Sequence, residues 1–449
     1  MAHYELIIIG AGPGGYETAL LAAERGKKVL LVNGGRLGGT CLNEGCIPTK
    51  CMVKDASVVS LMKDSGEFGV GEVKFEIDFN KVIERRESVV NTLREGVAGL
   101  LKRAGVTLVE GMAKFKDDRT VTVGDDEFSA DNIIIATGSS SKALPIPGAD
   151  ADWVLDSTGI LNLEYIPAHL VIVGGGVIGL EFASIFRSFG SEVTVIEFMK
   201  NIAPTFDSDI SKRLKQSLAK RGIKILTGAA CKKIEQNSDY HIVTTYELKG
   251  KEETVESTDL LMAVGRKPNV ENLNLEAAGV IYSPKGIAVD DNMRTNVNHI
   301  YAIGDVNARL MLAHVASFQG VRALNAIDGK SDNIRFDVVP AALFTEPECA
   351  AVGLTEEQCK ELGMAVRVGK SFFRANGKAL AAGEPDGICK LIFNADTDEL
   401  VGAHIMGAEA AILAQQCCDF ITARRTAADI RQTIFGHPTL SEVILAAAH

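Results

Sequence analysis

The sequence lacks the features that mark several classes of protein. Within its 449 residues, no apolar run reaches the roughly 20 residues of a membrane-spanning helix. Basic residues are not in excess, since 47 lysines and arginines stand against 58 aspartates and glutamates, for a net charge of −11. Nucleic acids and anionic membranes attract basic surfaces. We therefore expect no membrane span and no nucleic-acid partner.

The chain also lacks the cysteine pattern of a secreted protein and a secretory leader. Nine cysteines, an odd number, are spread over a long chain. The first residues run directly into an apolar strand, without the basic and apolar regions of a signal peptide. These features predict a cytoplasmic protein, in which a disulfide is more often catalytic than structural. The length and an apolar content of 46% predict a globular protein of two to four domains.

A glycine-rich turn near the start predicts a dinucleotide site. Gly10, Gly12 and Gly15 have the spacing G-x-G-x-x-G, after an apolar strand and before a helical pattern. Such glycines let the backbone approach a pyrophosphate at a helix N-terminus. The acid expected about 20 residues later is replaced by Asn33, which accepts a hydroxyl hydrogen bond without a charge. Either the ribose contact is weaker, or another residue makes it.

The stretch from Gly38 to Lys50, G-G-T-C-L-N-E-G-C-I-P-T-K, places Cys41 and Cys46 five residues apart. On an ideal helix their Cα atoms would be roughly 8 Å apart, beyond the approximately 7 Å limit of a relaxed disulfide. A bond between them needs a distorted turn, which Gly45 can supply, and a distorted disulfide is easily reduced. We predict a redox-active pair. The alternatives are a zinc half-site and two buried thiols.

The opening module repeats at residue 170. Gly174, Gly176 and Gly179 repeat the glycine spacing, and Glu197 follows Gly174 by 23 residues, as Asn33 follows Gly10. Here the acid is present, which predicts NAD rather than NADP because the acid binds a free ribose 2′-hydroxyl. The alternative is that Glu197 is only a solvated charge at a strand end.

Further segments complete the expected organisation. The turn Ala136-Thr137-Gly138 lets a backbone approach closely, and Asp305 at a strand end is either a sugar-hydroxyl ligand or a helix cap. Cys417 and Cys418 lie in a helical pattern and are expected to be packing residues, and His404 is expected in a core or an interface.

We predict an α/β fold with two Rossmann-like domains, divided as residues 1–143, 144–265, 266–335 (completing the first site) and 336–449.

These motifs occur along the entire chain in the order of the FAD-dependent pyridine nucleotide-disulfide oxidoreductases, which the sequence resembles. The shared stretches are G-A-G-P-G-G-Y, G-G-T-C-L-N-E-G-C-I-P-T-K, A-T-G, the second glycine motif, Y-A-I-G-D and H-P-T-L-S-E. The resemblance implies an FAD domain, an NAD domain and a C-terminal α+β dimerisation domain. Within the family, the sequence looks most like the enzymes that oxidise dihydrolipoamide.

The resemblance also implies roles for individual residues. Cys46 would be the sulfur next to the flavin and Cys41 the outer sulfur that meets the substrate. Lys50 and Glu181 match the family's ion pair near the flavin. His437 and Glu442 match a catalytic base and its orienting carboxylate, supplied across a homodimer interface; alone, His437 before Pro438 would be an ordinary turn histidine. The expected cofactor contacts are Gly10, Gly12, Gly15, Asn33, Gly39, Thr40, Lys50, Gly138, Asp305 and Ala313 for FAD, and Gly174, Gly176, Gly179, Glu197 and Gly265 for NAD.

The expected reaction is the oxidation of protein-bound dihydrolipoamide to lipoamide with NAD. The expected partner is the lipoyl domain of a 2-oxoacid dehydrogenase complex or the H protein of glycine cleavage. The alternatives are a related flavoprotein reductase for another disulfide or for mercuric ion, and a subunit retained for complex assembly. Phe435 departs from the family pattern, in which many lipoamide enzymes carry a second histidine. No metal site is predicted.

Overall fold

The computed structural model describes residues 2–71 and 73–449, and its contacts divide the chain into two units. Each unit is assembled from three separate stretches of sequence. Unit 1 comprises Met1–Cys51, Asn80–Lys142 and Gly265–Ile334, and unit 2 comprises Met52–Phe79, Ala143–Val264 and Arg335–His449. No helix within the described residues is long and apolar enough to cross a membrane.

Unit 1 is built on a sheet with the strand order β3-β2-β1-β6-β5-β4, and β19 pairs with β6. Strands β1, β2, β3, β6 and β19 run parallel, and the apolar run of β1 is buried, with Leu6, Ile7 and Ile8 at 0% exposure. A parallel strand covered on both faces requires such a continuous apolar run. The strands are β1 (Ala2–Ile9), β2 (Val29–Asn33), β3 (Thr107–Glu110), β4 (Ala113–Phe115), β5 (Thr120–Val123), β6 (Asp126–Ile135) and β19 (Ile300–Ala302).

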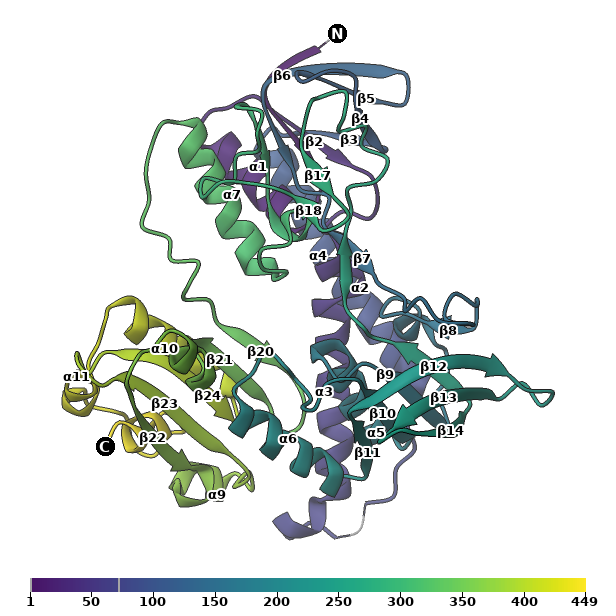
Figure 1. The fold of residues 1–449 in the computed structure, drawn as a ribbon, viewed down its shortest axis with the longest axis vertical. Helices are drawn as coiled ribbons and strands as arrows, with labels where there is room; N and C mark the ends of the chain where they lie inside the picture. Colours follow the sequence, from purple (N-terminus) through teal and green to yellow (C-terminus); the bar gives the residue numbers. More distant parts are fainter. Residues whose placement is uncertain (1, 72) are drawn as a thin grey trace. The chain divides into compact units, whose positions relative to one another are not determined.

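Helices α1 and α7 lie side by side in unit 1, although they come from opposite ends of the unit's sequence (Figure 1). Small residues allow this approach: a Cβ on Gly14 of α1 would lie 3.0 Å from the Cβ of Ala316 on α7. Arg25 and Lys27, just after α1, form ion pairs of 2.8 and 2.7 Å with Asp328, just after α7. The helices and short elements that lie wholly or partly in unit 1 are α1 (Pro13–Glu24), α2 (Gly39–Glu44), α3 (Cys46–Lys63), α4 (Phe79–Arg103), α7 (Ala313–Ile327), η3 (Gly304–Asn307), β7 (Ser139–Ser141), β16 (Arg266–Pro268), β17 (Tyr282–Ser283) and β18 (Gly286–Ile287).

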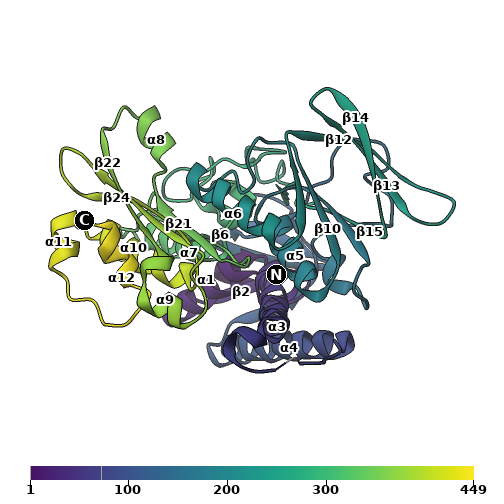
Figure 2. The ribbon, with the colours of Figure 1, turned by 90° about the horizontal axis from the view of Figure 1, so that it is seen from below.

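Unit 2 contains a second parallel sheet, with the order β11-β10-β9-β15-β8. Its β11-β10-β9 edge repeats the β3-β2-β1 edge of unit 1, as the repeated glycine motif predicts. A separate antiparallel sheet of β12, β13 and β14 follows (Figure 2). The elements are β8 (Val154–Leu155), β9 (His169–Val173), β10 (Glu192–Glu197), β11 (Ile223–Thr227), β12 (Ala229–Gln236), β13 (Ile242–Leu248), β14 (Lys251–Ser257), β15 (Asp259–Met262), α5 (Val177–Phe189), α6 (Ser208–Lys220), η1 (Ser65–Phe68) and η2 (Ile160–Asn162).

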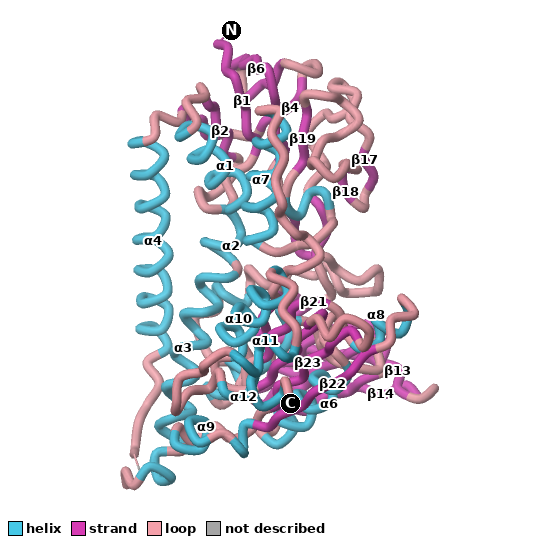
Figure 3. Tube along the Cα trace, turned by 90° about the vertical axis from the view of Figure 1, so that its left-hand side faces the viewer, coloured by secondary structure: helices cyan, strands magenta, loops and turns pink. Residues whose placement is uncertain are grey.

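The C-terminal part of unit 2 is an antiparallel sheet, β20-β21-β24-β23-β22, with helices α10, α11 and α12 near its strands (Figure 3). Cys417 and Cys418 of α10 are 0% and 9% exposed, and His404 of β24 is 1% exposed, so the packing roles predicted for them are confirmed. The elements are β20 (Ala341–Leu343), β21 (Cys349–Gly353), β22 (Val366–Phe372), β23 (Ile388–Asn394), β24 (Leu400–Met406), α8 (Glu356–Glu361), α9 (Gly377–Ala381), α10 (Ala410–Thr422), α11 (Ala427–Gln432), α12 (Glu442–Ala447) and η4 (Phe373–Ala375).

A buried ion cluster joins the C-terminal sheet to α6. Lys390 of β23 is 1% exposed, and its Nζ lies 2.9 Å from both oxygens of Asp207, the N-cap of α6, which is 0% exposed. Glu356 and Asp209 contribute further contacts of 2.7 and 3.1 Å. Burial alone would lower the pKa of Lys390, but the hydrogen bonds to Glu356 and Asp207 reverse that effect and raise it. The lysine is therefore charged at neutral pH.

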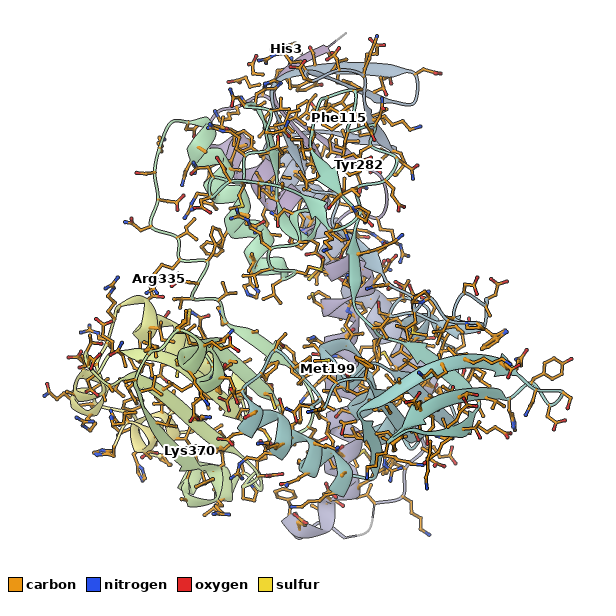
Figure 4. The ribbon with its side chains drawn as sticks, viewed as in Figure 1. His3, Phe115, Met199, Tyr282, Arg335 and Lys370 are labelled. Atoms are coloured by element: carbon orange, nitrogen blue, oxygen red, sulfur yellow. The ribbon has the colours of Figure 1, made fainter. Side chains whose placement is uncertain are left out.

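Replacing Lys390 with methionine is expected to lower the free energy of unfolding by about 3–5 kcal/mol, because it leaves the buried Asp207 carboxylate without its cation. Urea denaturation at fixed protein concentration measures the change. Lys370→Met is the matched control: Lys370, labelled in Figure 4, pairs with Asp209 at a half-exposed site, where an ion pair contributes only about 0–1 kcal/mol. Equal losses of unfolding free energy in the two variants would show that the buried Lys390–Asp207 pair stabilises the fold no more than the half-exposed pair does.

Candidate functional site

The first glycine turn in unit 1 is packed so closely that side chains are excluded from it. A Cβ on Gly15 would lie 1.8 Å from the carbonyl oxygen of Gly10, and a Cβ on Gly39 would lie 2.6 Å from the Cα of Gly12. Gly12 is the N-cap of α1, and Gly39, with a φ of 61°, is the first residue of α2. This backbone cradle at a helix N-terminus fits the pyrophosphate of FAD, as the sequence predicts.

Cys41 and Cys46 lie on two different helices, α2 and α3, which Gly45 separates. Gly45 has a φ of −145° and a ψ of −108°, and Cys46 is the first residue of α3. The distorted turn expected at Gly45 is therefore confirmed. A hydrogen bond between the Cys41 and Cys46 side chains, and then burial, raise the pKa of the Cys41 thiol. The two cysteine side chains thus meet at the junction of the two helices.

Cys41 is half-buried and Cys46 is exposed in unit 1. The assignment of Cys46 as the inner sulfur and Cys41 as the outer one therefore stays a prediction. Thr40 is on α2 beside Cys41, and Lys50 is on α3 one turn after Cys46. The positive charge of Lys50 partly offsets the increase in the pKa of Cys41.

Asp305, predicted to contact the flavin's sugar chain, lies at the start of η3 in a polar chain of three residues. Its carboxylate accepts a short hydrogen bond from the Ser139 hydroxyl, and the Arg266 Nε donates to the same hydroxyl oxygen at 2.7 Å. Arg266 also donates to the Ser139 carbonyl, at 2.6 Å. Sequence reasoning did not select Ser139 or Arg266. The pairing of β7 with β16 brings them together, and only the neighbouring Gly138 carried a signal.

The second glycine turn, in unit 2, has the same construction with an acid in place. A Cβ on Gly179 would lie 2.1 Å from the Gly174 carbonyl oxygen, and Gly176 is the N-cap of α5. Glu197 ends β10, is 7% exposed, and accepts a hydrogen bond of 2.6 Å from the Gly175 amide on one oxygen and one from the Met199 amide on the other. Two backbone donors hold this carboxylate in place beside the turn, where an NAD ribose is expected.

Replacing Glu197 with alanine is expected to raise the Michaelis constant for NAD by about 10- to 100-fold, since a hydrogen bond to a charged group contributes about 1.5–3 kcal/mol. The preference for NAD over NADP should shrink as well. Steady-state kinetics with both nucleotides measures these changes. Glu192→Ala, at the exposed start of the same strand, is the control. An unchanged constant for NAD in Glu197→Ala would show that the ribose contact is elsewhere.

His437 and Glu442 form a hydrogen-bonded pair in unit 2. The Nδ1 of His437 lies 3.0 Å from Oε1 of Glu442, and the Thr439 amide donates to Oε2 at 2.9 Å. The hydrogen bond with His437, followed by that from Thr439, lowers the pKa of Glu442. The His437–Pro438 peptide is cis, and the histidine side chain is 79% exposed. A histidine held by a carboxylate in this way is oriented for proton transfer.

The remaining predicted residues are distributed over both units. Glu181 of α5 is 4% exposed in unit 2, and its Oε1 accepts a hydrogen bond of 3.0 Å from the Phe344 amide. Its ion pair with Lys50 of unit 1 stays a prediction. Gly138 and Ala313 lie in unit 1, Ala313 as the first residue of α7. Gly265, expected at the NAD site, is the first residue of the last stretch of unit 1, and its φ is 112°.

Family models match most of the chain. Residues 4–320 match the pyridine nucleotide-disulphide oxidoreductase model, and residues 339–448 match the dimerisation domain of that family. Dihydrolipoyl dehydrogenases of Staphylococcus aureus and Geobacillus stearothermophilus are 42% and 41% identical to the chain. These matches cover 99% of this chain in both cases, and 96% and 95% of the relatives.

Solved structures show the same fold over the full length. An LpdA structure from Mycobacterium tuberculosis matches with a TM-score of 0.91 at 27% identity, covering 100% of this chain and 99% of that one. An HOCl-induced flavoprotein disulfide reductase from Escherichia coli matches with a TM-score of 0.89 at 30% identity, covering 99% of each chain.

These matches confirm the predicted fold class, with its C-terminal dimerisation domain, and the predicted enzyme class. They also confirm FAD and NAD as the cofactors, which the two glycine turns fit. The chain belongs to the pyridine nucleotide-disulphide oxidoreductase family.

Proposed function

We propose that the chain is an NAD-dependent oxidoreductase that oxidises the dithiol of dihydrolipoamide to the cyclic disulfide of lipoamide. The observation that carries the redox chemistry is the meeting of Cys41 and Cys46 at the Gly45 break. The choice of substrate rests on the dihydrolipoyl dehydrogenases that match over the full length. The residue roles below are part of the proposal.

The two glycine turns would hold the cofactors. Gly10, Gly12, Gly15 and Asp305 would bind FAD, and Gly174, Gly176, Gly179 and Glu197 would bind NAD. FAD, when bound, accepts an electron pair from a thiolate and passes it to NAD as hydride, which is chemistry that protein side chains cannot supply.

The first step is an attack on the Cys41–Cys46 disulfide. A thiolate is the nucleophile in disulfide exchange, so a base must take the proton of a neutral dithiol. When Nδ1 of His437 donates to Glu442, Nε2 remains to accept that proton, and the carboxylate stabilises the imidazolium that forms. The substrate sulfur then bonds to Cys41, the Cys41–Cys46 bond breaks, and Cys46 leaves as a thiolate.

The second step releases the product. The remaining substrate thiol attacks its partner sulfur in the mixed disulfide, which closes the lipoamide ring and frees Cys41. The substrate has then lost two electrons and two protons, and the cysteine pair has gained the electrons. One of the two protons is then held by His437 and the other by the reduced cysteine pair, which carries one negative charge.

We propose that the enzyme is a homodimer in which His437 and Glu442 act on the disulfide of the partner subunit. The match of residues 339–448 to a dimerisation domain supports this arrangement. The proposed protein partner is a lipoyl domain of a 2-oxoacid dehydrogenase complex or the glycine-cleavage H protein. The cytoplasmic location predicted from cysteine usage stays a prediction.

A substrate panel tests this function. Dihydrolipoamide is offered anaerobically with NAD or NADP, and NADH is offered with glutathione disulfide, coenzyme A disulfide or mercuric ion. The proposal expects the highest kcat/KM for dihydrolipoamide with NAD. A higher value for glutathione disulfide, coenzyme A disulfide or mercuric ion would identify a reductase of another substrate instead.

A further inference from the structure

The two glycine modules differ in where they place an acid. In the second module, Glu197 at the end of β10 lies in register with Thr227 at the end of β11. In the first module the corresponding register pair, at the ends of β2 and β3, is Asn33 and Glu110. Each module therefore has one glutamate and one neutral polar residue at the same sheet edge. In the second module the glutamate ends the second strand of the module, whereas in the first module it ends the third strand.

The Asn33 side chain donates hydrogen bonds to two neighbouring residues. Asn33 is 4% exposed, and its amide nitrogen donates to Oε2 of Glu110 and to the Gly35 carbonyl, both at 2.8 Å. These two bonds use both hydrogens of the carboxamide, and its oxygen is an uncharged acceptor. The Gly111 amide also donates to the Asn33 carbonyl at 2.9 Å, which fixes the end of β3 against β2. Asn33 thus holds the Glu110 carboxylate at this edge of the sheet.

Glu110 is the charged group of the pair and is exposed at the end of β3. The carboxyl ends of parallel strands next to a glycine turn are where a dinucleotide fold binds the adenosine ribose. A carboxylate accepts hydrogen bonds from ribose hydroxyls more strongly than a carboxamide does. An acid on β3 at this edge is therefore positioned to replace the acid missing from β2.

We propose that Glu110 is the residue that binds the adenosine ribose of FAD, and that Asn33 is a positioning residue that holds its carboxylate. The proposal goes beyond the dithiol chemistry and depends only on FAD binding at the first glycine turn. It accounts for a cofactor module that lacks an acid at the usual position on its second strand.

The test measures the binding of flavins to the apoprotein by fluorescence quenching. Glu110→Thr is expected to weaken FAD binding by about 10- to 100-fold, the range expected for loss of a charged hydrogen bond. Binding of FMN, which lacks the adenosine, should not change. Glu127→Thr is the control and should bind both flavins normally, since Glu127 is a half-exposed carboxylate of the same sheet that pairs with Lys116.

A double variant that exchanges the positions of the two residue types provides a second test. Asn33→Glu combined with Glu110→Thr reproduces the arrangement of Glu197 and Thr227, and it should regain FAD affinity relative to Glu110→Thr alone. Unchanged FAD affinity in Glu110→Thr, or equal losses for FAD and FMN, would overturn the proposal. So would an exchange variant with normal thermal unfolding that binds FAD no better than Glu110→Thr. If the substrate panel shows that dihydrolipoamide is not the preferred substrate, the result of this test still stands, because it measures flavin affinity and not turnover.

Discussion

Replacing Cys41 with serine is expected to reduce the oxidation of dihydrolipoamide by at least about 10⁴-fold, as loss of a catalytic nucleophile does in other enzymes. Serine cannot form the mixed disulfide, so the substrate sulfur has no acceptor. Bound FAD should remain at the wild-type ratio, since the hydroxyl is similar in size to the thiol and the glycine turn is untouched. Steady-state kinetics and the flavin absorbance of the purified variant measure the two quantities.

Cys231→Ser is the matched control. Cys231 lies on β12 of unit 2, and burial raises its pKa to about 11, so it is a thiol at neutral pH with no role in the proposed exchange. This variant should keep its turnover. If Cys41→Ser instead loses its flavin, Cys41 serves the cofactor site and not the substrate.

Replacing His437 with glutamine is expected to lower kcat/KM for dihydrolipoamide by about 10²- to 10⁴-fold at neutral pH, because the dithiol loses its general base. The deficit should shrink as the pH rises toward the pKa of the substrate thiols, since the substrate then ionises without help. A pH profile of kcat/KM measures both effects. His241→Gln is a close control, because His241 also pairs with a glutamate, Glu256, on the surface of unit 2.

Glu442 should stay ionised throughout that profile. Its pKa is lowered by the hydrogen bond with His437, so the carboxylate stays ionised at neutral pH and the pair is lost only as the pH falls through that lowered value. Loss of the pair should therefore occur below the usual range of a glutamate. A deficit in His437→Gln that is equally large at every pH would contradict the role of base.

The sequence predicts the modules of this protein better than the contacts between distant residues. The glycine motifs predict both parallel sheets, because the strand, turn and helix of each module are contiguous. Gly45 also predicts the break between α2 and α3, since the spacing of Cys41 and Cys46 does not fit one regular helix. These inferences use only neighbouring residues.

The features that the sequence does not predict are contacts between residues that are far apart in the chain. Asn33 and Glu110 meet because β2 and β3 pair, 77 residues apart, and Lys390 meets Asp207 over 183 residues. The sequence shows that Asn33 replaces an acid, but not which residue compensates. Unit 1 is assembled from three stretches, and no local pattern indicates that Met52–Phe79 belongs to unit 2.

The most direct test of the account is to count reactive thiols at Cys41 and Cys46. The oxidised enzyme is alkylated anaerobically, before and after one equivalent of dihydrolipoamide without NAD. Trypsin cleavage after Arg36 and Lys50 then isolates both cysteines on one peptide for mass spectrometry. The account predicts an unlabelled peptide before reduction and a labelled one afterwards. Labelling without reduction, or no labelling after it, would contradict a redox-active Cys41–Cys46 pair.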